Sequence, residues 1–484
     1  MSPRTEYRAA VAVAVALVLL RSAVPLVIER SFDADQAIVG LMAKHLSEFR
    51  TFPLFFYGQN YMLGVQAWIA APFFWLGGPT IVMLRLPLLL INIGVAWALI
   101  AMFRRLGLRP ALGLVAALPF AMTTPVMSDA LLRPLGAAVE PFAWVLILWA
   151  LRQRPVWFGF VFCVGFLHRE FVLYAAPALV IAQWCEARWW RVRDVAMAVG
   201  GFAAMWLTID LLKRSTSLYG PLGANFATET LLMQSRQLAL WLSLDAYTDR
   251  VWQLVSRGVP DMLGVRSYRL SAYHGLFSGL NVGSAVAGVA LLLAAVVAAV
   301  RLVTLPKPSD STPAAAFASY LGAIGFFAIA AYGLNGGIDP QFMPVVRYAL
   351  FVLLIPVALF GLYLRRENRQ SVRTTVVVLI CAWAGWTAVD ATRVMTEYVR
   401  TPPNLPHHEL ADYLVRNRIR YARAGYWDAY LVTFLSREQV IVASTEQTRI
   451  LAYGELVNQH AGEAVHLVRQ PCEGERRVAA WCLE

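Results

Sequence analysis

The chain has 484 residues, of which 59% are hydrophobic and only 15% are charged. Its mean hydropathy of +0.56 is above that of soluble globular proteins, so the composition excludes a cytosolic enzyme. Repeated apolar stretches close to membrane-spanning length favour one large helical body in a lipid bilayer over about three soluble domains.

The net charge of +12 comes from 42 basic and 30 acidic residues, and nearly all of the basic residues are arginines. These arginines form short clusters between apolar stretches rather than one basic face, which argues against nucleic-acid binding. Such clusters set the orientation of a polytopic membrane protein, because basic loops stay on the cytoplasmic side.

The first predicted element is an apolar helix at 9–28, which follows Arg4 and Arg8 and has no signal-peptide cleavage site. We expect it to span the membrane with its start in the cytoplasm. A polar, aromatic loop and a short apolar helix at 62–76 follow. Because this helix is shorter than the roughly 20 residues of a span, it is predicted to be re-entrant or juxtamembrane.

The next apolar stretch, 81–103, ends in an arginine cluster and is the second expected crossing. Nine further crossings are expected at 110–127, 136–151, 155–168, 171–186, 194–211, 276–300, 314–334, 348–364 and 374–391. With these eleven crossings, the arginine clusters fall on the cytoplasmic side, as the positive-inside rule requires. A first loop (29–80), a long loop (212–275) and the tail (392–484) then face outward.

The expected organisation is therefore a transmembrane domain at 1–391 and a small α/β domain at 392–484. Within the tail, 408–417 has helical spacing, whereas 439–443 and 464–468 have the character of strands. Cys472 and Cys482 are predicted to form a disulfide, because an outward-facing tail lies where thiols oxidise. Two reduced thiols in a cytoplasmic tail are the alternative.

Acidic residues are scarce, so Asp33 and Asp35 stand out directly after the first helix. They open an amphipathic stretch at 36–49, and a carboxylate at a helix start is stabilised by the helix dipole. The simpler interpretation of either residue is a helix N-cap. The Asp-x-Asp spacing also matches a metal-binding motif of nucleotide-sugar transferases, so a divalent cation is possible, although no cofactor is firmly indicated.

Four segments of the first part of the chain carry a family resemblance. They are Asp35-Gln36, Leu41-Met42-Ala43-Lys44-His45-Leu46, Phe56-Tyr57-Gly58 and Leu84-Arg85-Leu86-Pro87. This pattern resembles the first outer loop of the polyprenyl-phosphate-sugar-dependent membrane glycosyltransferases, the superfamily that includes protein O-mannosyltransferases and aminoarabinose transferases. Asp35 occupies the position of the family's catalytic aspartate. Gln36 stands where many members have Glu, and Asp33 is a possible substitute.

The resemblance implies an α-helical polytopic fold and transfer of a sugar from a polyprenyl-phosphate donor to an acceptor at the periplasmic face of a bacterial inner membrane. The acceptor would be a glycolipid, a polysaccharide or a protein. A carboxylate has to take a proton from the attacking hydroxyl or amine, so Asp35 or Asp33 is the expected general base. Cationic groups are expected beside the departing phosphate.

Further residues are candidates for substrate binding. They are Arg347, which resembles an Arg of the Arg-Tyr pair in family members, together with Tyr57, Arg85, Glu140, Arg169 and Glu170. Alternatives stay open: Arg347 could anchor a helix at the interface, Arg169 and Glu170 could pair with each other, and Glu140 could be a structural partner of Arg133. The long loop is expected to lie over the bundle as a lid or a cover.

Two other functions remain open on the sequence alone. A transporter or lipid flippase would also be polytopic, but the chain lacks a recognisable internal repeat and a mid-span acidic residue. A catalytically inactive relative that binds polyprenyl lipids is the second alternative, and Gln36 favours it.

Overall fold

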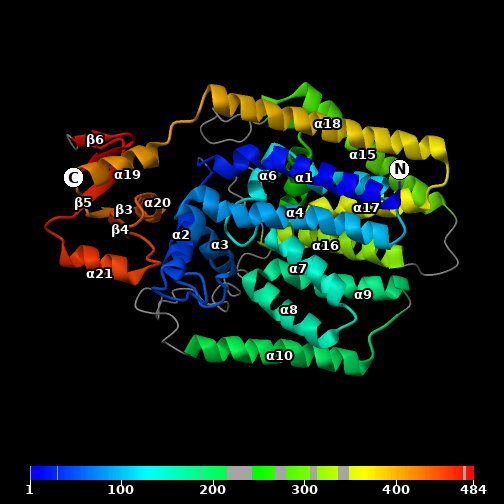
Figure 1. The fold of residues 1–484 in the computed structure, drawn as a ribbon, viewed down its shortest axis with the longest axis horizontal. Helices are drawn as coiled ribbons and strands as arrows, with labels where there is room; N and C mark the ends of the chain where they lie inside the picture. The colour runs from blue at the N-terminus through cyan, green and yellow to red at the C-terminus, as the bar shows by residue number, and fades with distance from the viewer. Residues whose placement is uncertain are drawn as a thin grey trace.

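The structure is a computed structural model that describes residues 2–29, 31–186, 188–214, 243–267, 279–305, 313–335, 348–472 and 476–484. Most of its helices run side by side along one direction, with the N-terminus near one end of the bundle (Figure 1). A small α/β segment, 406–484, lies beyond the opposite end and carries the C-terminus. We call it the C-terminal segment.

Six helices in the described part of the chain are long and apolar enough to cross a membrane. They are α1 (Pro3–Val27), α4 (Ile81–Arg105), α10 (Val192–Arg214), α15 (Val282–Thr304), α16 (Pro313–Asn335) and α18 (Gln370–Arg400). The predicted class, a helical polytopic membrane protein with a small C-terminal α/β part, is thereby confirmed. The number of eleven crossings stays a prediction, because several expected spans are short helices.

Shorter helices pack between and beside the long ones. They are α3 (Val65–Gly77), α5 (Pro110–Ala121), α6 (Pro125–Ala130), α7 (Glu140–Leu151), α8 (Pro155–His168), α9 (Ala175–Glu186) and α17 (Leu354–Arg366). Proline at the first or second position of α5, α6, α7 and α8 suits a helix start, where its missing N–H is not needed. Apolar side chains of short and long helices together form a continuous core that includes Phe142 and Trp149 of α7, Phe103 of α4 and Phe317 of α16.

Close backbone contact joins α8 to α10 at the edge of the bundle (Figure 1). A Cβ built on Gly159 would lie 1.9 Å from the Ala198 carbonyl oxygen, and one on Gly201 would lie 2.3 Å from the Val156 carbonyl oxygen. Small residues allow membrane helices to approach in this way. Only glycine fits at these two positions.

The helix α2 (Ala34–Ser47) lies across the end of the bundle next to the C-terminal segment (Figure 1). Arg85 of α4 holds the adjoining end of α1, because its fully buried guanidinium donates to the Pro25 carbonyl at 2.8 Å and to the Ile28 carbonyl. These carbonyls lack partners within the helix, so Arg85 satisfies them.

The described part of the long loop packs on the bundle. It contains α13 (Leu244–Gln253), a π-helical turn at Leu254–Gly258, α14 (Val259–Met262) and β1 (Arg266–Ser267). Strand β1 pairs antiparallel with β2 (Gly279–Leu280), which lies just beyond the loop. Arg250 donates to the Gly333 carbonyl of α16 at 3.3 Å, and the Tyr247 ring lies 2.5 Å from a Cβ built on that glycine. Residues 215–242 and 268–278 lie outside the described residues.

The C-terminal segment is a five-stranded sheet with three helices. In chain order the elements are α19 (Pro406–Arg416), β3 (Tyr421–Ala424), α20 (Tyr426–Leu435), β4 (Ile441–Ser444), α21 (Leu451–Gln459), β5 (Val465–Arg469), β6 (Arg476–Val478) and β7 (Trp481–Leu483). The strand order is β4-β3-β5-β7-β6, in which β4, β3 and β5 are parallel and the other pairs antiparallel. Crossover helices α20 and α21 link the parallel strands, as parallel pairing requires.

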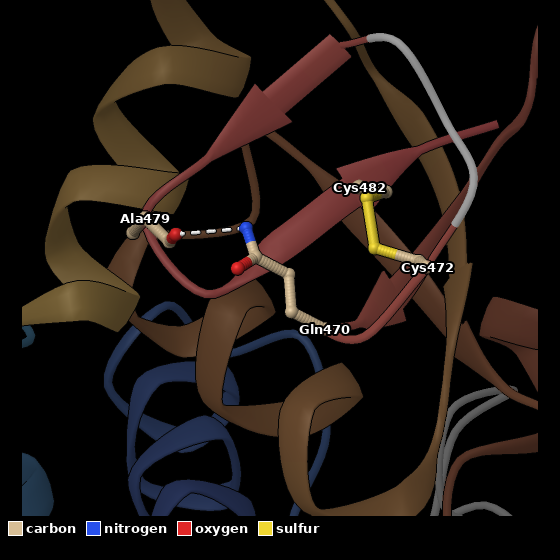
Figure 2. Close-up of a disulfide and its surroundings, with 4 residues drawn as sticks. All are labelled: Gln470, Cys472, Ala479 and Cys482. Atoms are coloured by element: carbon tan, nitrogen blue, oxygen red, sulfur yellow. Dashed lines mark hydrogen bonds between the residues drawn. A yellow bond between two sulfur atoms is a disulfide. The ribbon is translucent and has the colours of Figure 1, made fainter.

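The expected cysteine pair, Cys472 and Cys482, is joined as a disulfide in the structure. Figure 2 shows it linking β7 to the chain that follows β5, close to a hydrogen bond from the Gln470 side chain to the Ala479 carbonyl at 3.3 Å. The bond covalently links the antiparallel part of the sheet to the chain segment after β5. The predicted domain boundary at 391 falls within α18, which continues to Arg400, and the division into two domains stays a prediction.

Candidate active site

Asp35 lies in the first turn of α2 and is partly buried. The Tyr426 hydroxyl, from the C-terminal segment, donates a hydrogen bond to Asp35 Oδ1. No described residue donates to the other oxygen, Oδ2. The contact holds the carboxylate in one orientation and leaves one oxygen able to accept a proton.

The fold of the C-terminal segment places Tyr426 at this position. Strand β3 ends at Ala424, Gly425 caps α20, and Tyr426 is the first helical residue. Tyr426 therefore lies at the carboxyl edge of the parallel strands, the edge at which open α/β sheets bind ligands. Its backbone N–H donates to Glu446 Oε2 at 3.2 Å. Burial raises the pKa of Tyr426, and the negative charge of Asp35 raises it further, so the hydroxyl keeps its proton.

Arg449 brings a buried cation to the same edge. It follows β4, its exposed fraction is 7%, and its Nε donates to the Tyr426 hydroxyl at 3.4 Å. The guanidinium carbon lies 5.6 Å from the centre of the Phe56 ring of the first loop. Gly58 has a φ of +76°, and a Cβ there would lie 2.8 Å from Arg449 Cδ, so glycine leaves the space that Arg449 occupies.

Asp33, the second candidate base, is the N-cap of α2. Its Oδ1 accepts the Gln36 backbone N–H at 3.0 Å. Burial raises the pKa of Asp33. The Gln36 side chain donates to the Ser31 carbonyl at 2.7 Å, so this residue has a structural contact of its own. The structure thus gives the two aspartates different surroundings.

Asp129 has its two oxygens engaged by neighbours. Its Oδ1 accepts the Ser31 hydroxyl at 2.7 Å, and its Oδ2 accepts two hydrogen bonds from Arg133 at 2.7 and 3.0 Å. Arg85 also donates to the Ser31 hydroxyl at 3.4 Å. Arg85 and Asp129 therefore hold the start of the first loop in place.

Glu140 and Arg169 belong to a buried polar cluster around Gly136. Four atoms of this cluster lack a hydrogen-bond partner among the described residues: Gln66 Nε2, Glu140 Oε1, His168 Nε2 and Arg169 Nε. Gly136 has a φ of +72°, and a Cβ there would lie 2.8 Å from His168 Nε2. Buried polar groups without partners are rare in native proteins and often mark a ligand site.

This cluster lies beside α2. Val39 and Met42 of α2 line the same small cavity as Gly136 and His168. Asp35 precedes Val39 by one helical turn, about 6 Å along the axis, and lies on the same face. The structure therefore places Asp35, the Gly136 cluster and Arg449 around the first part of α2.

Tyr57, another predicted contact residue, is not part of the Gly136 cluster. The Tyr57 hydroxyl is buried against His45 Nδ1 at 2.9 Å. Arg169 donates to the Leu135 carbonyl and forms no ion pair with Glu170, which is exposed, among the residues described. Arg347 lies outside the described residues.

Metal ligands are also absent from the part of the chain that the structure describes, where no three His, Cys, Asp or Glu residues are grouped to hold an ion. His407 Nε2 lies 3.0 Å from Asp428 Oδ1, and His408 Nε2 lies 2.5 Å from Glu29 Oε2. The two adjacent histidines thus contact different carboxylates.

Tyr426 and Arg449 were not predicted as site residues. No motif marks them, and each is separated from Asp35 by nearly the whole chain. The only available signal was the α/β pattern of the tail, since residues after parallel strands commonly line sites.

No family model matches the chain, and no curated protein sequence is similar to it. Solved structures do match. ArnT from Cupriavidus metallidurans bound to undecaprenyl phosphate aligns with a TM-score of 0.58 at 10% identity, over 98% of this chain and 96% of that one. The Archaeoglobus fulgidus oligosaccharyltransferase aligns with a TM-score of 0.52 at 12% identity, over 96% of this chain and 69% of that one. The fold recognised from the first-loop motifs is thereby confirmed.

Proposed function

We propose that this chain, which has the fold of an aminoarabinose transferase and an oligosaccharyltransferase, transfers a sugar from a polyprenyl-phosphate donor to an acceptor. The observation that carries the proposal is the Asp35 carboxylate, held by Tyr426 next to the buried cation Arg449. The binding of undecaprenyl phosphate by the similar ArnT supports a lipid-linked donor.

In the proposed reaction Asp35 is the general base. Its Oδ2 takes the proton of an acceptor hydroxyl or amine while the acceptor atom attacks the anomeric carbon of the donor sugar. The bond from that carbon to the phosphate oxygen breaks, and the polyprenyl phosphate leaves with the bonding electrons. Tyr426 keeps Oδ1 engaged so that Oδ2 faces the acceptor.

Arg449 supplies positive charge for the departing phosphate. A buried guanidinium stabilises developing negative charge more strongly than an exposed one, because water screens it less. Its Nε lies 3.4 Å from the Tyr426 hydroxyl, and this hydroxyl in turn contacts the proposed base Asp35. Arg169 of the Gly136 cluster is the second cation proposed to contact the donor.

The proposed location is a bacterial inner membrane, with Asp35 and the C-terminal segment on the periplasmic side. The helix α2, which carries Asp35, and the C-terminal segment lie at the same end of the helix bundle (Figure 1). The arginine clusters of the sequence favour the cytoplasm for the opposite end.

The test measures sugar release from radiolabelled polyprenyl-phosphate sugars by the full chain in lipid nanodiscs. We expect Asp35→Asn to lower turnover by roughly 10²–10⁴-fold, the usual contribution of a general base. Asp33→Asn is the matched control, because Asn is as good an N-cap as Asp and should retain most of the turnover.

Tyr426→Phe should reduce turnover less than Asp35→Asn, since it removes only the contact that orients the base. Wild-type turnover in a folded Asp35→Asn variant would exclude Asp35 as the base. Loss of turnover in Asp33→Asn but not in Asp35→Asn would identify Asp33 as the general base.

A further inference from the structure

A cationic groove lies between the end of α2 and the C-terminal segment. It encloses a volume of about 720 Å³. Its charged lining consists of Lys44, Arg50, Arg418, Arg420, Arg437 and Glu438. Known small-molecule sites have volumes of roughly 300–1,000 Å³, so the groove is large enough for a ligand.

Two of the cations already have acidic partners. Lys44 lies 2.9 Å from Glu48 and also contacts Glu438, and Arg50 lies 2.8 Å from Glu438. These carboxylates balance Lys44 and Arg50. By contrast, Arg418, Arg420 and Arg437 lie within 4 Å of no carboxylate of the described residues. The groove therefore carries three uncompensated positive charges.

The backbone holds two of these arginines in an unfavourable conformation. Arg418 follows the C-cap of α19 with a φ of +57°, and Arg437 follows the C-cap of α20 with a φ of +55°. At the end of α19, the backbone N–H groups of Arg418 and the residue after it donate to the carbonyls of Val415 and Leu414. At the end of α20, the N–H groups of Arg437 and the residue after it donate to the carbonyls of Phe434 and Thr433. This is the Schellman motif.

Glycine is the usual residue at this position of the motif, because a side chain is strained there. Two separate helices of this chain carry arginine instead, and both arginines line the same cavity. Attraction to the helix dipole favours a basic residue anywhere in the last turn and does not require this strained position. The same motif at the end of α2 has Phe49 with a φ of +55°, so the position is not reserved for a basic residue in this chain. What distinguishes the two arginines is that both line one groove, together with Arg420, and that none of the three has an acidic partner among the described residues.

We propose that this groove binds a multiply charged oxyanion, such as the phosphate groups of a soluble phosphorylated molecule or of a lipid headgroup. Arginine binds phosphate oxygens with two parallel hydrogen bonds and keeps its charge at all relevant pH values. Three such groups around one cavity suit a ligand that carries at least two negative groups.

The groove is separate from the proposed catalytic carboxylate. Lys44 follows Asp35 by nine residues on α2, which corresponds to about 14 Å along the helix. Arg418 and Arg437 precede β3 and β4, whereas Tyr426 and Arg449 follow those strands. The inference therefore does not depend on the proposed glycosyl transfer.

The test is calorimetric titration of inorganic tripolyphosphate into the full chain in neutral-lipid nanodiscs. Arg418→Gly combined with Arg437→Gly removes two charges and relieves two strained residues. We expect this variant to bind at least about tenfold more weakly, while its melting temperature is unchanged or higher. Arg477→Gln, which removes one exposed arginine of β6 outside the groove, is the control for loss of surface charge and should bind like wild type.

A second set of titrations uses nanodiscs that contain an anionic lipid with a phosphorylated headgroup. If the lipid weakens tripolyphosphate binding to wild type but not to the double variant, the groove binds a lipid headgroup. If the affinity of wild type for tripolyphosphate is the same with and without the lipid, the groove binds a soluble ligand. Equal affinity of wild type and the folded double variant would overturn the proposal. No binding by folded wild type, or equal weakening in Arg477→Gln, would overturn it as well.

Discussion

Glu438 is the charged residue through which the C-terminal segment meets the end of α2. Its carboxylate lies 3.0 Å from His45 Nε2 and 2.8 Å from Arg50, and the Tyr453 hydroxyl donates to it at 2.7 Å. Because a carboxylate only accepts, His45 Nε2 has to carry the proton, and Nδ1 then accepts from Tyr57. Burial lowers the pKa of His45, which favours this neutral form.

This network predicts a pH dependence of stability. Burial alone would raise the pKa of Glu438, but hydrogen bonds from His45, Lys44 and Tyr453 outweigh it and hold the pKa well below the usual 4.5. A carboxyl group with a lowered pKa in the folded state stabilises that state above its usual pKa, and the stabilisation is lost as the pH falls below it.

We therefore expect Glu438→Gln to lower the unfolding free energy at pH 7 by about 3 kcal/mol, since it leaves the buried Lys44 without this partner. The difference from wild type should persist down to about pH 4.5 and shrink below it. Thermal unfolding monitored across this pH range checks both statements. Glu463→Gln, at an exposed position, should show no such difference, and a constant difference down to pH 3 would contradict the assignment.

At the residue scale, the sequence alone names Asp35 and Asp33 as candidate site residues because they stand in a short local motif, and their roles stay predictions. The sequence alone does not indicate that Tyr426, Arg449 or Glu438 lies beside α2. These residues are brought to α2 by the packing of distant segments, and their neighbours in the sequence carry no motif. A single sequence contains no signal for such long-range contacts.

At the scale of elements, long apolar helices were predicted well and short ones less so. The expected span at 171–186 divides into a 3-10 turn, Glu170–Tyr174, and α9. Strands β3, β6 and β7 of the C-terminal segment were missed because they are only three or four residues long, and in β3 and β6 arginine also hides the pattern of a strand. Strand β4 overlaps its predicted range because its β-branched residues are consecutive.

The contact between α8 and α10 yields a prediction at this scale. In its membrane-length window, only 17% of α10 is buried, and the contact with α8 is the most extensive that the helix makes. We expect Gly201→Ala to separate the two helices, because the added methyl group would overlap the Val156 carbonyl. Melting temperature and yield of folded protein in detergent are the measurements.

The neighbouring Gly200 provides the control. A Cβ there meets nothing within 4 Å, so Gly200→Ala should be neutral or slightly stabilising through its higher helix propensity. Equal effects of the two substitutions would show that glycine is not required for the contact.

For the whole molecule, the position of the C-terminal segment predicts which end of the helix bundle faces the periplasm. The segment packs on α2 at one end of the bundle, and it contains the disulfide between Cys472 and Cys482. A disulfide persists outside the reducing cytoplasm. The end of the bundle that carries Asp35 should therefore face the periplasm.

Reporter fusions test this topology. Alkaline phosphatase fused after residue 484 should be active, and a green fluorescent protein at the same place should be dark. Fusions after Arg366, at the end of α17, should give the reverse result, since this arginine-rich end is expected in the cytoplasm. Fluorescence from the C-terminal fusion would contradict the predicted orientation.

The contact between Asp35 and Tyr426 spans 391 positions of the chain. At a synthesis rate of roughly 5–20 residues per second, on the order of 20–80 s pass between the emergence of the two residues from the ribosome. Asp35 is therefore made first and lacks its hydrogen-bond donor until the growing chain includes Tyr426. The site described above is consequently complete only after Tyr426 and Arg449 have been made, and a chain that stops before these residues would lack it.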